Sequence, residues 1–294
     1  MKLALFHVFG KEDGDRLHNL YALAFPAGYT ALFHADTAID DVLLLEQAVV
    51  TNGLILSLYK PKGAAANEFR FKVFHPHSRL PLSDVLPILE DMGLRVIDEV
   101  PHAISPAYDD LDLVMIHDFG LTSRSASKIS IADIKVNFEE VFSKIWHGEM
   151  ESDGLNSLVI NAGLSWRQIV ILRTYARYLK QIKAPFSLEY MEQALRNNPA
   201  ITAKIVRLFE THFDPASGTS SNAHANRLKK EIKRQLERVA SADEDRILRR
   251  FLNGVEATLR TNCYQTADDG GPKSYLSIKL DSSQIDDLPL PRPL

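Results

Sequence analysis

Residues 80–104 read LPLSDVLPILEDMGLRVIDEVPHAI, and this stretch decides the fold class of the first half of the chain. Ser83 and Asp84 are residue types that begin helices, and Gly93 stands where a helix typically ends. After Gly93 the spacing of apolar residues changes to that of a half-buried strand. The stretch therefore predicts a short helix that leads into a strand, within a small α+β domain.

The residues on either side of this stretch continue the α+β pattern. Apolar residues at helical spacing predict helices over residues 37–50 and 131–146. The resulting order of elements is α, β, β, α, β, β, α, which suits an antiparallel sheet with helices packed on one face, the ferredoxin-like arrangement. The predicted strands are residues 54–59, 69–74, 94–104 and 111–119.

The first 36 residues are harder to assign. Leu3 to Phe9 form a short apolar run typical of a strand, and residues 21–32 favour a further strand pair, although Pro26 and Gly28 leave its register open. We interpret residues 1–36 either as extra strands of the sheet or as the end of a preceding module.

The second half of the chain changes character, because strand patterns are absent from about residue 155 onward for more than a hundred residues. Ser187 is expected to cap one helix, Pro199 to open the next, and Ser241 with Glu244 to form a capping box. Residues 155–265 are thus predicted to form an all-helical domain. The expected helices cover residues 166–182, 187–198, 199–213, 227–239 and 241–262.

The last segment, residues 274–294, contains one strand pattern at Tyr275 to Leu280 followed by a connector. A lone strand is not stable by itself, so it must pair with the helical domain or with chain beyond residue 294. We expect the second arrangement.

Composition restricts the function classes. The 294 residues carry 34 Lys and Arg against 38 Asp and Glu, a formal net charge of -4, so no general affinity for polyanions is expected. Cys263 is the only cysteine, which favours a reducing compartment, and no apolar run reaches the length of a membrane span. We therefore expect a soluble cytoplasmic protein with neither nucleic acid nor membrane as a partner.

No motif of a catalytic, cofactor or metal site is found in the sequence. A Gly-rich nucleotide loop, GxSxG, HExxH and CxxC are all missing. His75 and His77 lie two residues apart at a strand end, a spacing that metal ligands use, but without a third ligand nearby they are interpreted as loop residues. The acidic cluster of Asp109, Asp110 and Asp112 is interpreted as a solvated turn.

Two groups of basic residues could instead bind anions. The first is interpreted as a polar helix face paired with Asp and Glu of a neighbouring subdomain. The second is interpreted as a solvated helix face, since Glu231 and Glu237 dilute its charge and no aromatic residues are interleaved with it. The first group is Arg167, Arg173, Arg177 and Lys180, and the second is Arg227, Lys229, Lys230, Lys233, Arg234 and Arg238.

One position is predicted to bind a ligand. The turn into the helix at Ser83 would present free backbone N–H groups, which can hold a small carboxylate such as that of an amino acid. Capping by Ser83 and Asp84 explains the same residue types without a ligand. These two residues are therefore candidates for an effector site.

Five stretches together resemble a known family, the large bacterial NAD-specific glutamate dehydrogenases. The resemblance runs from about residue 37 to residue 294, and one departure is Cys263, where an aromatic residue is expected. The stretches are LPLSDVLPILEDMGLRVIDEVPH at 80–102, NAGLSWRQIVILRTYARYLKQ at 161–181, LFETHFDP at 208–215, RILRRFLNGVEATLRTNCYQ at 246–265 and YLSIKLDSSQIDDLPLPRP at 275–293.

The resemblance implies an ACT-like regulatory domain over residues 37–150, a helical domain over 155–265, and entry into the catalytic core at 274–294. It implies that the full-length protein oxidises L-glutamate with NAD, as a homo-oligomer, whereas this piece lacks the catalytic core and should be inactive alone. No catalytic residue can be carried over to it. An alternative stays open, a free-standing ACT-type amino-acid sensor or protein-interaction module.

Overall fold

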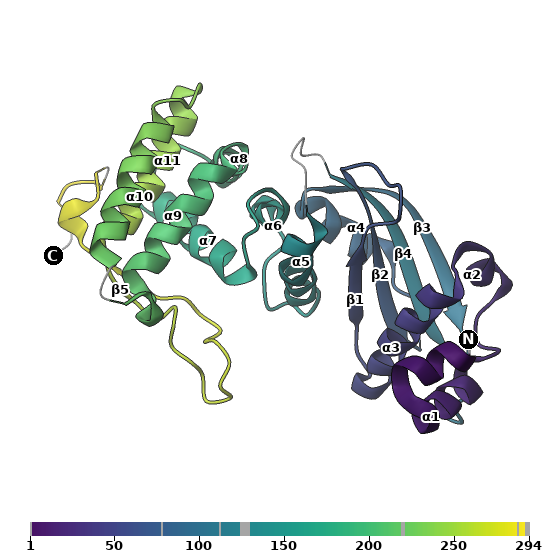
Figure 1. Ribbon diagram of the computed structural model, residues 1–294. Coiled ribbons are helices and arrows are strands. Elements are labelled where there is room, and N and C mark those ends of the chain that lie inside the picture. The colour runs from purple at the N-terminus through teal and green to yellow at the C-terminus, as the bar shows by residue number, and fades with distance from the viewer. Residues whose placement is uncertain are drawn as a thin grey trace. The chain divides into compact units, whose positions relative to one another are not determined.

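In a computed structural model, the structure describes residues 2–77, 79–111, 113–123, 130–218, 221–286 and 288–291. The chain divides into two compact units, residues 1–90 with 94–139, and residues 91–93 with 140–294. The first unit contains the sheet, and the second is built mainly from helices (Figure 1). This division agrees with the predicted α+β half followed by a helical half.

The sheet of the first unit has four strands in the order β1-β2-β4-β3, and all neighbours are antiparallel. The predicted succession of helices and strands from residue 37 to residue 146 is confirmed. The elements are α1 (Lys2–Tyr21), α2 (Ala27–Leu32), α3 (Ala35–Thr51), β1 (Ile55–Tyr59), β2 (Glu68–Pro76), α4 (Leu82–Asp91), β3 (Leu94–Ile104), β4 (Val114–Ser123) and α5 (Ile131–Trp146).

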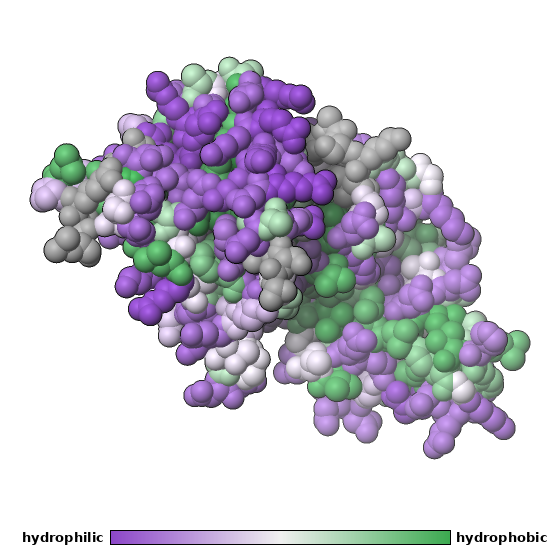
Figure 2. Space-filling view, turned by 60° about the vertical axis from the view of Figure 1, so that its left-hand side comes forward, coloured by the Kyte–Doolittle hydropathy of each residue, from purple (hydrophilic) through white to green (hydrophobic). Residues whose placement is uncertain are grey.

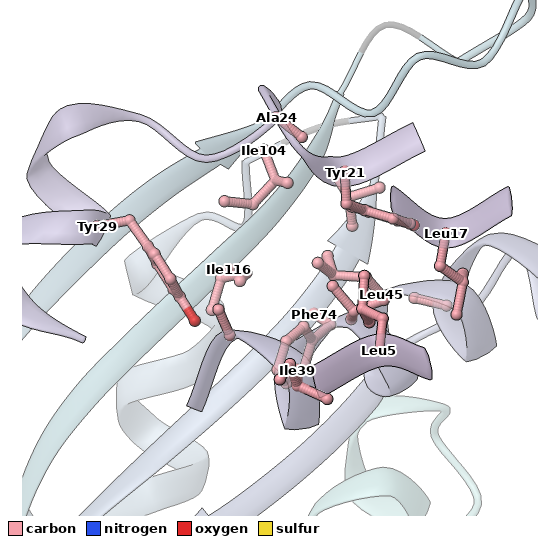
Figure 3. Close-up of a cluster of buried hydrophobic side chains, with 14 of the residues drawn as sticks. Leu5, Leu17, Tyr21, Ala24, Tyr29, Ile39, Leu45, Phe74, Ile104 and Ile116 are labelled. Atoms are coloured by element: carbon pink, nitrogen blue, oxygen red, sulfur yellow. The ribbon is translucent and has the colours of Figure 1, made fainter. Parts of the chain in front are cut away.

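One face of this sheet is covered by the three N-terminal helices. Leu5 and Tyr21 of α1, together with Leu45 of α3, belong to one buried cluster with Phe74 of β2 and Ile116 of β4 (Figure 3). Tyr21 and Leu45 are both fully buried. Packing against these helices therefore buries the side of β2 and β4 from which Phe74 and Ile116 project.

The opposite face is covered as well, so the prediction of helices on one face only is wrong. Phe71 of β2 makes an edge-to-face contact with Phe138 of α5, with ring centroids 5.2 Å apart. The backbone N–H of Leu80, just before α4, donates to Nε2 of His117, which lies on the same face as Phe71. Both sides of β4 are consequently buried at nearly every position, which is the pattern of a strand between two layers.

The first 36 residues are helical, which corrects the prediction of strands over residues 3–9 and 21–32. In α1 the inward residues Leu5 and Phe9 are four positions apart, whereas Val8 between them is 54% exposed. That spacing matches a helix and not the two-residue period of a strand. Helix α1 bends at Gly10, whose φ of 79° and ψ of 177° are not helical.

Strand β1 lies at one edge of the sheet, and a side chain of α5 occupies its free side. The N–H of Leu58 donates to the carboxylate of Glu139 at 2.7 Å. Burial raises the pKa of Glu139, and this backbone hydrogen bond opposes the shift. An edge strand otherwise exposes unpaired N–H groups to other chains, so Glu139 protects β1 at this position.

The second unit packs its helices around α7 and α11. Helix α11 contacts α7, α8 and α9, and α9 also contacts α10. The predicted helices at 166–182, 187–198 and 199–213 are confirmed within one or two residues. The elements are η1 (Gly154–Ser157), α6 (Leu158–Asn161), α7 (Trp166–Gln181), α8 (Leu188–Asn197), α9 (Pro199–Phe213), η2 (Pro215–Ser217), α10 (Ser221–Leu236), α11 (Ala242–Glu256), β5 (Thr258–Thr261), β6 (Ile278–Leu280) and η3 (Ser282–Gln284).

Capping residues in this unit act largely as their types predict. The Ser187 hydroxyl accepts from the N–H of Tyr190, and the Ser241 hydroxyl accepts from the N–H of Glu244. The capping box predicted for Ser241 and Glu244 is only half formed, because the Glu244 carboxylate accepts from the side chains of Asn197 and Asn198 instead. A capping box that the sequence reading did not identify begins α7, where Ser165 and Gln168 each accept from the other's backbone N–H. The starts of α7, α8 and α11 are thereby fixed by local hydrogen bonds.

The C-terminal strand has a partner within the chain, so the expectation of a partner beyond residue 294 is wrong. Strand β6 pairs antiparallel with β5, which occupies residues that we had assigned to the end of the last helix. Helix α11 ends at Glu256, and Thr258 turns its hydroxyl back to the carbonyl of Gly254. Leu259, which lies within the helix predicted over residues 241–262, is instead a residue of β5 and is 56% exposed. Threonines at two of the four positions of β5 suit a strand better than a helix.

Within the part of the chain that the structure describes, no helix has the length and apolar character needed to cross a membrane.

Candidate functional site

A cavity of about 990 Å³ lies within the second unit, and it is the main candidate site. Its walls come from α7, from residues 148–151, and from the loop that precedes β6. Charged and aromatic side chains line much of it. Those that matter for its chemistry are Lys144, Trp166, Arg167, Arg177, Lys273 and Tyr275.

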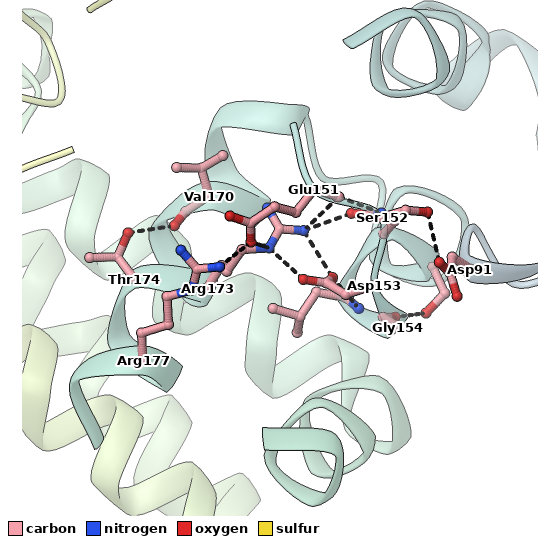
Figure 4. Close-up of polar contacts among 12 residues, drawn as sticks. Asp91, Glu151, Ser152, Asp153, Gly154, Val170, Arg173, Thr174 and Arg177 are labelled. Carbon is pink, nitrogen blue, oxygen red and sulfur yellow. Dashed lines mark hydrogen bonds and ion pairs between the residues drawn. The ribbon is translucent and has the colours of Figure 1, made fainter. Parts of the chain in front are cut away.

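Arg173 of α7 anchors one side of this cavity through a buried ion pair (Figure 4). Its guanidinium donates to both carboxylate oxygens of Asp153, at 2.5 and 2.9 Å, and to Oδ1 of Asn156 at 2.8 Å. Asp153 also accepts the N–H of Leu155 and so caps η1. Two parallel charge-assisted bonds hold η1 against α7 in a fixed orientation.

Arg177, one helical turn further, pairs with the carboxylate of Glu151, and the main-chain carbonyl of Glu151 accepts from Asn156 at 3.0 Å. The prediction that this basic face of α7 is ion-paired with acidic residues is thus confirmed for Arg173 and Arg177. It does not hold for Arg167.

Arg167 has no carboxylate partner among the described residues. Its guanidinium donates instead to two main-chain oxygens, those of Lys273 at 3.2 Å and Cys263 at 2.6 Å. It also lies 5.2 Å from the ring centroid of Trp166. Arg167 therefore ties α7 to two points of the loop between β5 and β6, and no carboxylate among the described residues pairs with its charge.

Trp166 organises the cationic side of the cavity. Lys144 approaches the same indole ring at 5.3 Å, and the indole N–H donates to Glu140 at 2.8 Å. Lys144 is itself paired with Glu149 at 2.6 Å. An indole between two cations is a geometry that cation–π attraction favours.

Cys263 is buried, and its main-chain oxygen accepts from the Arg167 guanidinium. Burial raises the pKa of its thiol, and the nearby Arg167 opposes the shift. A buried thiol that resists ionisation is a poor nucleophile, so Cys263 packs rather than reacts.

The first unit contains a second group of charged residues, a buried polar cluster that the sequence reading missed. Lys72 of β2 and Asp41 of α3 form an ion pair at 2.5 Å, with side chains only 3% and 5% exposed. The hydroxyl of Tyr29 donates to the same carboxylate at 2.5 Å. The Lys72 ammonium also lies 4.1 Å from the ring centroid of Phe33.

A second ion pair of this cluster joins Arg70 to Asp118 at 2.9 Å, and the hydroxyl of Tyr59 donates to Asp118 at 3.0 Å. Burial raises the pKa of both Asp41 and Asp118, and the adjacent cations oppose the shift. Each carboxylate is satisfied by a cation and a phenol, so these two ion pairs hold α2 and α3 on the sheet.

His102 of β3 completes the cluster. It is 3% exposed, and its Nε2 has no hydrogen-bond partner among the described residues. The rings of Tyr29 and Phe33 contact it edge-on. Burial lowers the pKa of His102, and the charge of Lys72 adds to that effect, so the imidazole is held neutral.

The predicted effector residues Ser83 and Asp84 lie on the surface in the first turn of α4, which begins at Leu82. The Ser83 hydroxyl donates to the Asp84 carboxylate at 3.2 Å. They lie in the first unit, whereas the cavity is confined to the second. Their role in binding an effector stays a prediction.

The other residues that we considered have ordinary surroundings. His77 contacts the side chain of Asn52 at 3.1 Å, and no cluster of three or more His, Cys, Asp or Glu suited to a metal occurs in the described ranges. Asp112 lies outside the described residues.

The second basic group lies on and just after α10. Arg227 pairs with Glu231 within α10, and Lys229 pairs with Glu256 of α11. Hydrophilic side chains dominate the upper left of Figure 2, where the C-terminal helices lie. The interpretation of this group as a solvated, ion-paired face is confirmed for these two residues.

Sequence comparisons place the chain among known proteins. Four models of glutamate dehydrogenase regions match it in succession: helical motif 2 at residues 4–48, the ACT3 domain at 53–134, helical motif 3 at 150–215, and the catalytic domain of bacterial NAD-glutamate dehydrogenase at 231–294. The NAD-specific glutamate dehydrogenase of Halomonas elongata is 38% identical over 285 residues, or 97% of this chain. The chain is a relative of the NAD-specific glutamate dehydrogenases.

Two further relatives of the same name support this assignment. The enzyme of Pseudomonas aeruginosa is 37% identical over 97% of the chain, and that of Mycobacterium tuberculosis is 35% identical over 96%. The chain spans only 17 to 18% of the length of these three relatives. It thus resembles one segment of a glutamate dehydrogenase.

The matched ranges agree with the two units. The ACT3 match contains all four strands of the sheet, and the helical motif 2 match contains α2 and most of α1 and α3. The catalytic-domain match begins within α10, earlier in the chain than residue 274, where we expected entry into the core. The cavity is therefore lined both by the helical motif 3 match, through α7, and by the catalytic-domain match, through the loop before β6.

Proposed function

We propose that this chain is a regulatory and scaffold segment of an NAD-dependent glutamate dehydrogenase. The reaction of the whole enzyme would be L-glutamate + NAD + water to 2-oxoglutarate + ammonium + NADH. The observation that carries the proposal is the match to relatives of that name over 97% of the chain, together with the matches to the ACT3 domain and to helical motifs 2 and 3 of glutamate dehydrogenase.

The chemistry itself is assigned to other parts of the enzyme. The cavity and the buried polar cluster hold their charged groups in hydrogen bonds and ion pairs, and neither places a nucleophile beside a base. NAD and glutamate would bind outside this segment. The chain would instead supply contacts to the rest of the catalytic domain, whose model it matches only over residues 231–294, and to other subunits of a cytoplasmic homo-oligomer.

Regulation would act through differential affinity. An amino-acid effector bound to the ACT-type unit shifts the enzyme only if it binds one conformation more tightly than the other. Ser83 and Asp84 at the start of α4 are the proposed contacts, because the exposed first turn of a helix favours a carboxylate.

A thermal-shift screen of the chain against the twenty amino acids, 2-oxoglutarate and NAD tests the regulatory function. A ligand at about 100 times its dissociation constant should stabilise the folded chain by about 2.7 kcal/mol. We expect one amino acid to give a saturable shift that Ser83→Ala with Asp84→Asn abolishes. A shift with NAD would contradict the assignment of the dinucleotide site to another region, and no shift with any amino acid would leave a scaffold without an effector.

A free-standing amino-acid sensor or interaction module is the second candidate. One observation favours it, since β6 pairs with β5 inside the chain and so requires no strand from elsewhere. A sensor would show the same amino-acid shift but would not support glutamate oxidation when placed inside a related enzyme.

A further inference from the structure

The cavity beside α7 contains two cations that no carboxylate neutralises. Arg167 and Lys273 form no ion pair among the described residues, whereas the other cations lining the cavity do: Lys144 pairs with Glu149, Arg173 with Asp153, and Arg177 with Glu151. The Arg167 guanidinium donates to the main-chain carbonyl of Lys273 at 3.2 Å, so the two residues form neighbouring parts of one cavity wall. Two cations without an acidic partner in one cavity favour the binding of an anion there.

Aromatic rings flank these cations. Arg167 lies 5.2 Å from the ring centroid of Trp166, and Lys273 lies 5.9 Å from that of Tyr275. Both cations are half-buried, so an anion bound to them would be shielded from part of the solvent. Charge-assisted hydrogen bonds are worth more in such a place than on an open surface.

The size of the cavity decides the class of ligand. A volume of about 990 Å³ lies at the upper end of the range of small-molecule sites and holds far more than one ion. Five cations line it, against three acids in the wall and Asp153, which neutralises Arg173 from outside the wall, so one positive charge is in excess. The cations are Lys144, Arg167, Arg173, Arg177 and Lys273, and the acids in the wall are Glu149, Glu151 and Asp269.

We propose that this cavity binds a small organic dianion, through carboxylate or phosphate oxygens that accept from Arg167 and Lys273. The ligand would lie between α7 and the loop before β6, so its binding would hold these two elements together. The inference that the chain binds an anion depends only on this geometry. The inference that such binding regulates the enzyme rests on the proposed function, in which the anion would link α7, a part of helical motif 3, to the loop, a part of the catalytic-domain match.

Fluorescence of Trp166 can report the binding directly. The chain has two tryptophans, and Trp146→Phe leaves Trp166, a residue of the cavity wall, as the single reporter. Glutarate, inorganic phosphate and the neutral analogue glutaramide would be titrated at constant ionic strength. We expect a saturable change with glutarate or with phosphate, the stronger of the two identifying the oxygen chemistry, and none with glutaramide.

The decisive variant is Lys273→Gln, because it removes a charge and keeps the main-chain carbonyl that accepts from Arg167. We expect it to weaken anion binding about tenfold, the loss of one charge-assisted contact. Lys180→Gln is the matched control, since Lys180 is an exposed cation on α7 outside the cavity wall, and it should leave binding unchanged.

Arg167→Gln should abolish saturable binding, and its melting temperature would show whether the chain still folds. The proposal is overturned if neither anion gives a saturable change, or if Lys273→Gln and Lys180→Gln bind with equal affinity. Neither result would bear on whether the chain supports glutamate oxidation, which a segment exchange measures separately.

Discussion

The buried ion pair between Lys72 and Asp41 gives the most demanding test of the first unit. Lys72→Met removes the ammonium and keeps a flexible apolar chain of similar length to pack beside Phe33. Asp41 would then retain only the hydroxyl of Tyr29 as a hydrogen-bond donor. A carboxylate 5% exposed and without its cation is strongly disfavoured.

Two physical bounds set the magnitude. Removing one partner of a buried ion pair typically costs about 3–5 kcal/mol. Asp41 can avoid the cost of an unpaired buried charge by taking up a proton. Protonating a carboxyl of ordinary pKa at about pH 7 costs about 4 kcal/mol. The expected loss of stability at neutral pH is therefore about 3–4 kcal/mol. It should fall to about 1.5 kcal/mol at about pH 5, because protonation costs about 1.4 kcal/mol less for each pH unit.

Hydrogen exchange read by mass spectrometry measures this loss where it occurs. A loss of about 3 kcal/mol should speed exchange of the β2 and β4 amides about 150-fold at neutral pH. Lys2→Met is the matched control in the same unit, since Lys2 and Asp15 form a pair whose side chains are 51% and 43% exposed. That control should change stability by less than about 1 kcal/mol.

The double variant Asp41→Leu with Lys72→Met should recover most of the loss, because replacing both partners leaves no buried charge. A cost for Lys72→Met below about 1 kcal/mol at neutral pH would refute this reasoning. The same cost at about pH 5 and about pH 7 would refute the role of Asp41 in it.

Three further predictions concern single positions. Burial lowers the pKa of His102, so the folded state binds fewer protons than the unfolded state. The free energy of unfolding should therefore fall as the pH drops below about 6.5, by up to about 1.4 kcal/mol per pH unit. His102→Phe should remove this pH dependence, as measured by urea melts. Gly93→Ala should cost more than Gly63→Ala by calorimetry, since both have positive φ but only at Gly93 would a Cβ meet another side chain, at 2.8 Å. Arg173→Gln should destabilise the second unit by about 3–5 kcal/mol in tryptophan-detected urea melts. Arg177→Gln should cost less than about 1 kcal/mol, because the Arg177 side chain is 60% exposed. Equal effects of the two substitutions would contradict the structural role of the buried Arg173 ion pair.

Elements with a clear period could be predicted from the sequence. Helix α7 and the strands β2 and β4 carry apolar spacing or runs long enough to fix their type, and serine caps set the starts of α8 and α11. Leu3 to Phe9 could not be assigned in this way, because a run of seven residues of which six are apolar suits a strand and a buried helix equally. Tertiary packing around Leu5 decides between them.

Features that depend on distant pairing were not predictable in the same way. Strand β5 forms because β6, more than fifteen residues later, pairs with it. The four residues of β5 are too few for their apolar pattern to predict a strand. Lys72 and Asp41 come together only through the packing of α3 on β2. No distinct signal for this pair is present in the sequence, because α3 and β2 carry other charged residues as well, such as Asp40 and Arg70.

The candidate site shows the same division. Spacing identified the basic face of α7, and the expectation that acids from another part of the chain pair with this face holds for Arg173 and Arg177. The different environment of Arg167 depends on the loop before β6, which folds back across residues far apart in sequence. Local sequence therefore indicated the charge of the site but not which charges stay uncompensated.

Exchange of this chain for the matching segment of the Pseudomonas aeruginosa NAD-specific glutamate dehydrogenase tests the proposed function most directly. The match covers 97% of the chain at 37% identity, so its ends define the exchange, and the same exchange with the Halomonas elongata segment is the control. Glutamate-dependent formation of NADH would be measured. We expect the chimera to retain activity comparable to that of the control chimera. A chimera that assembles to the same size as an active control but forms no NADH would contradict the assignment of this chain to a glutamate dehydrogenase.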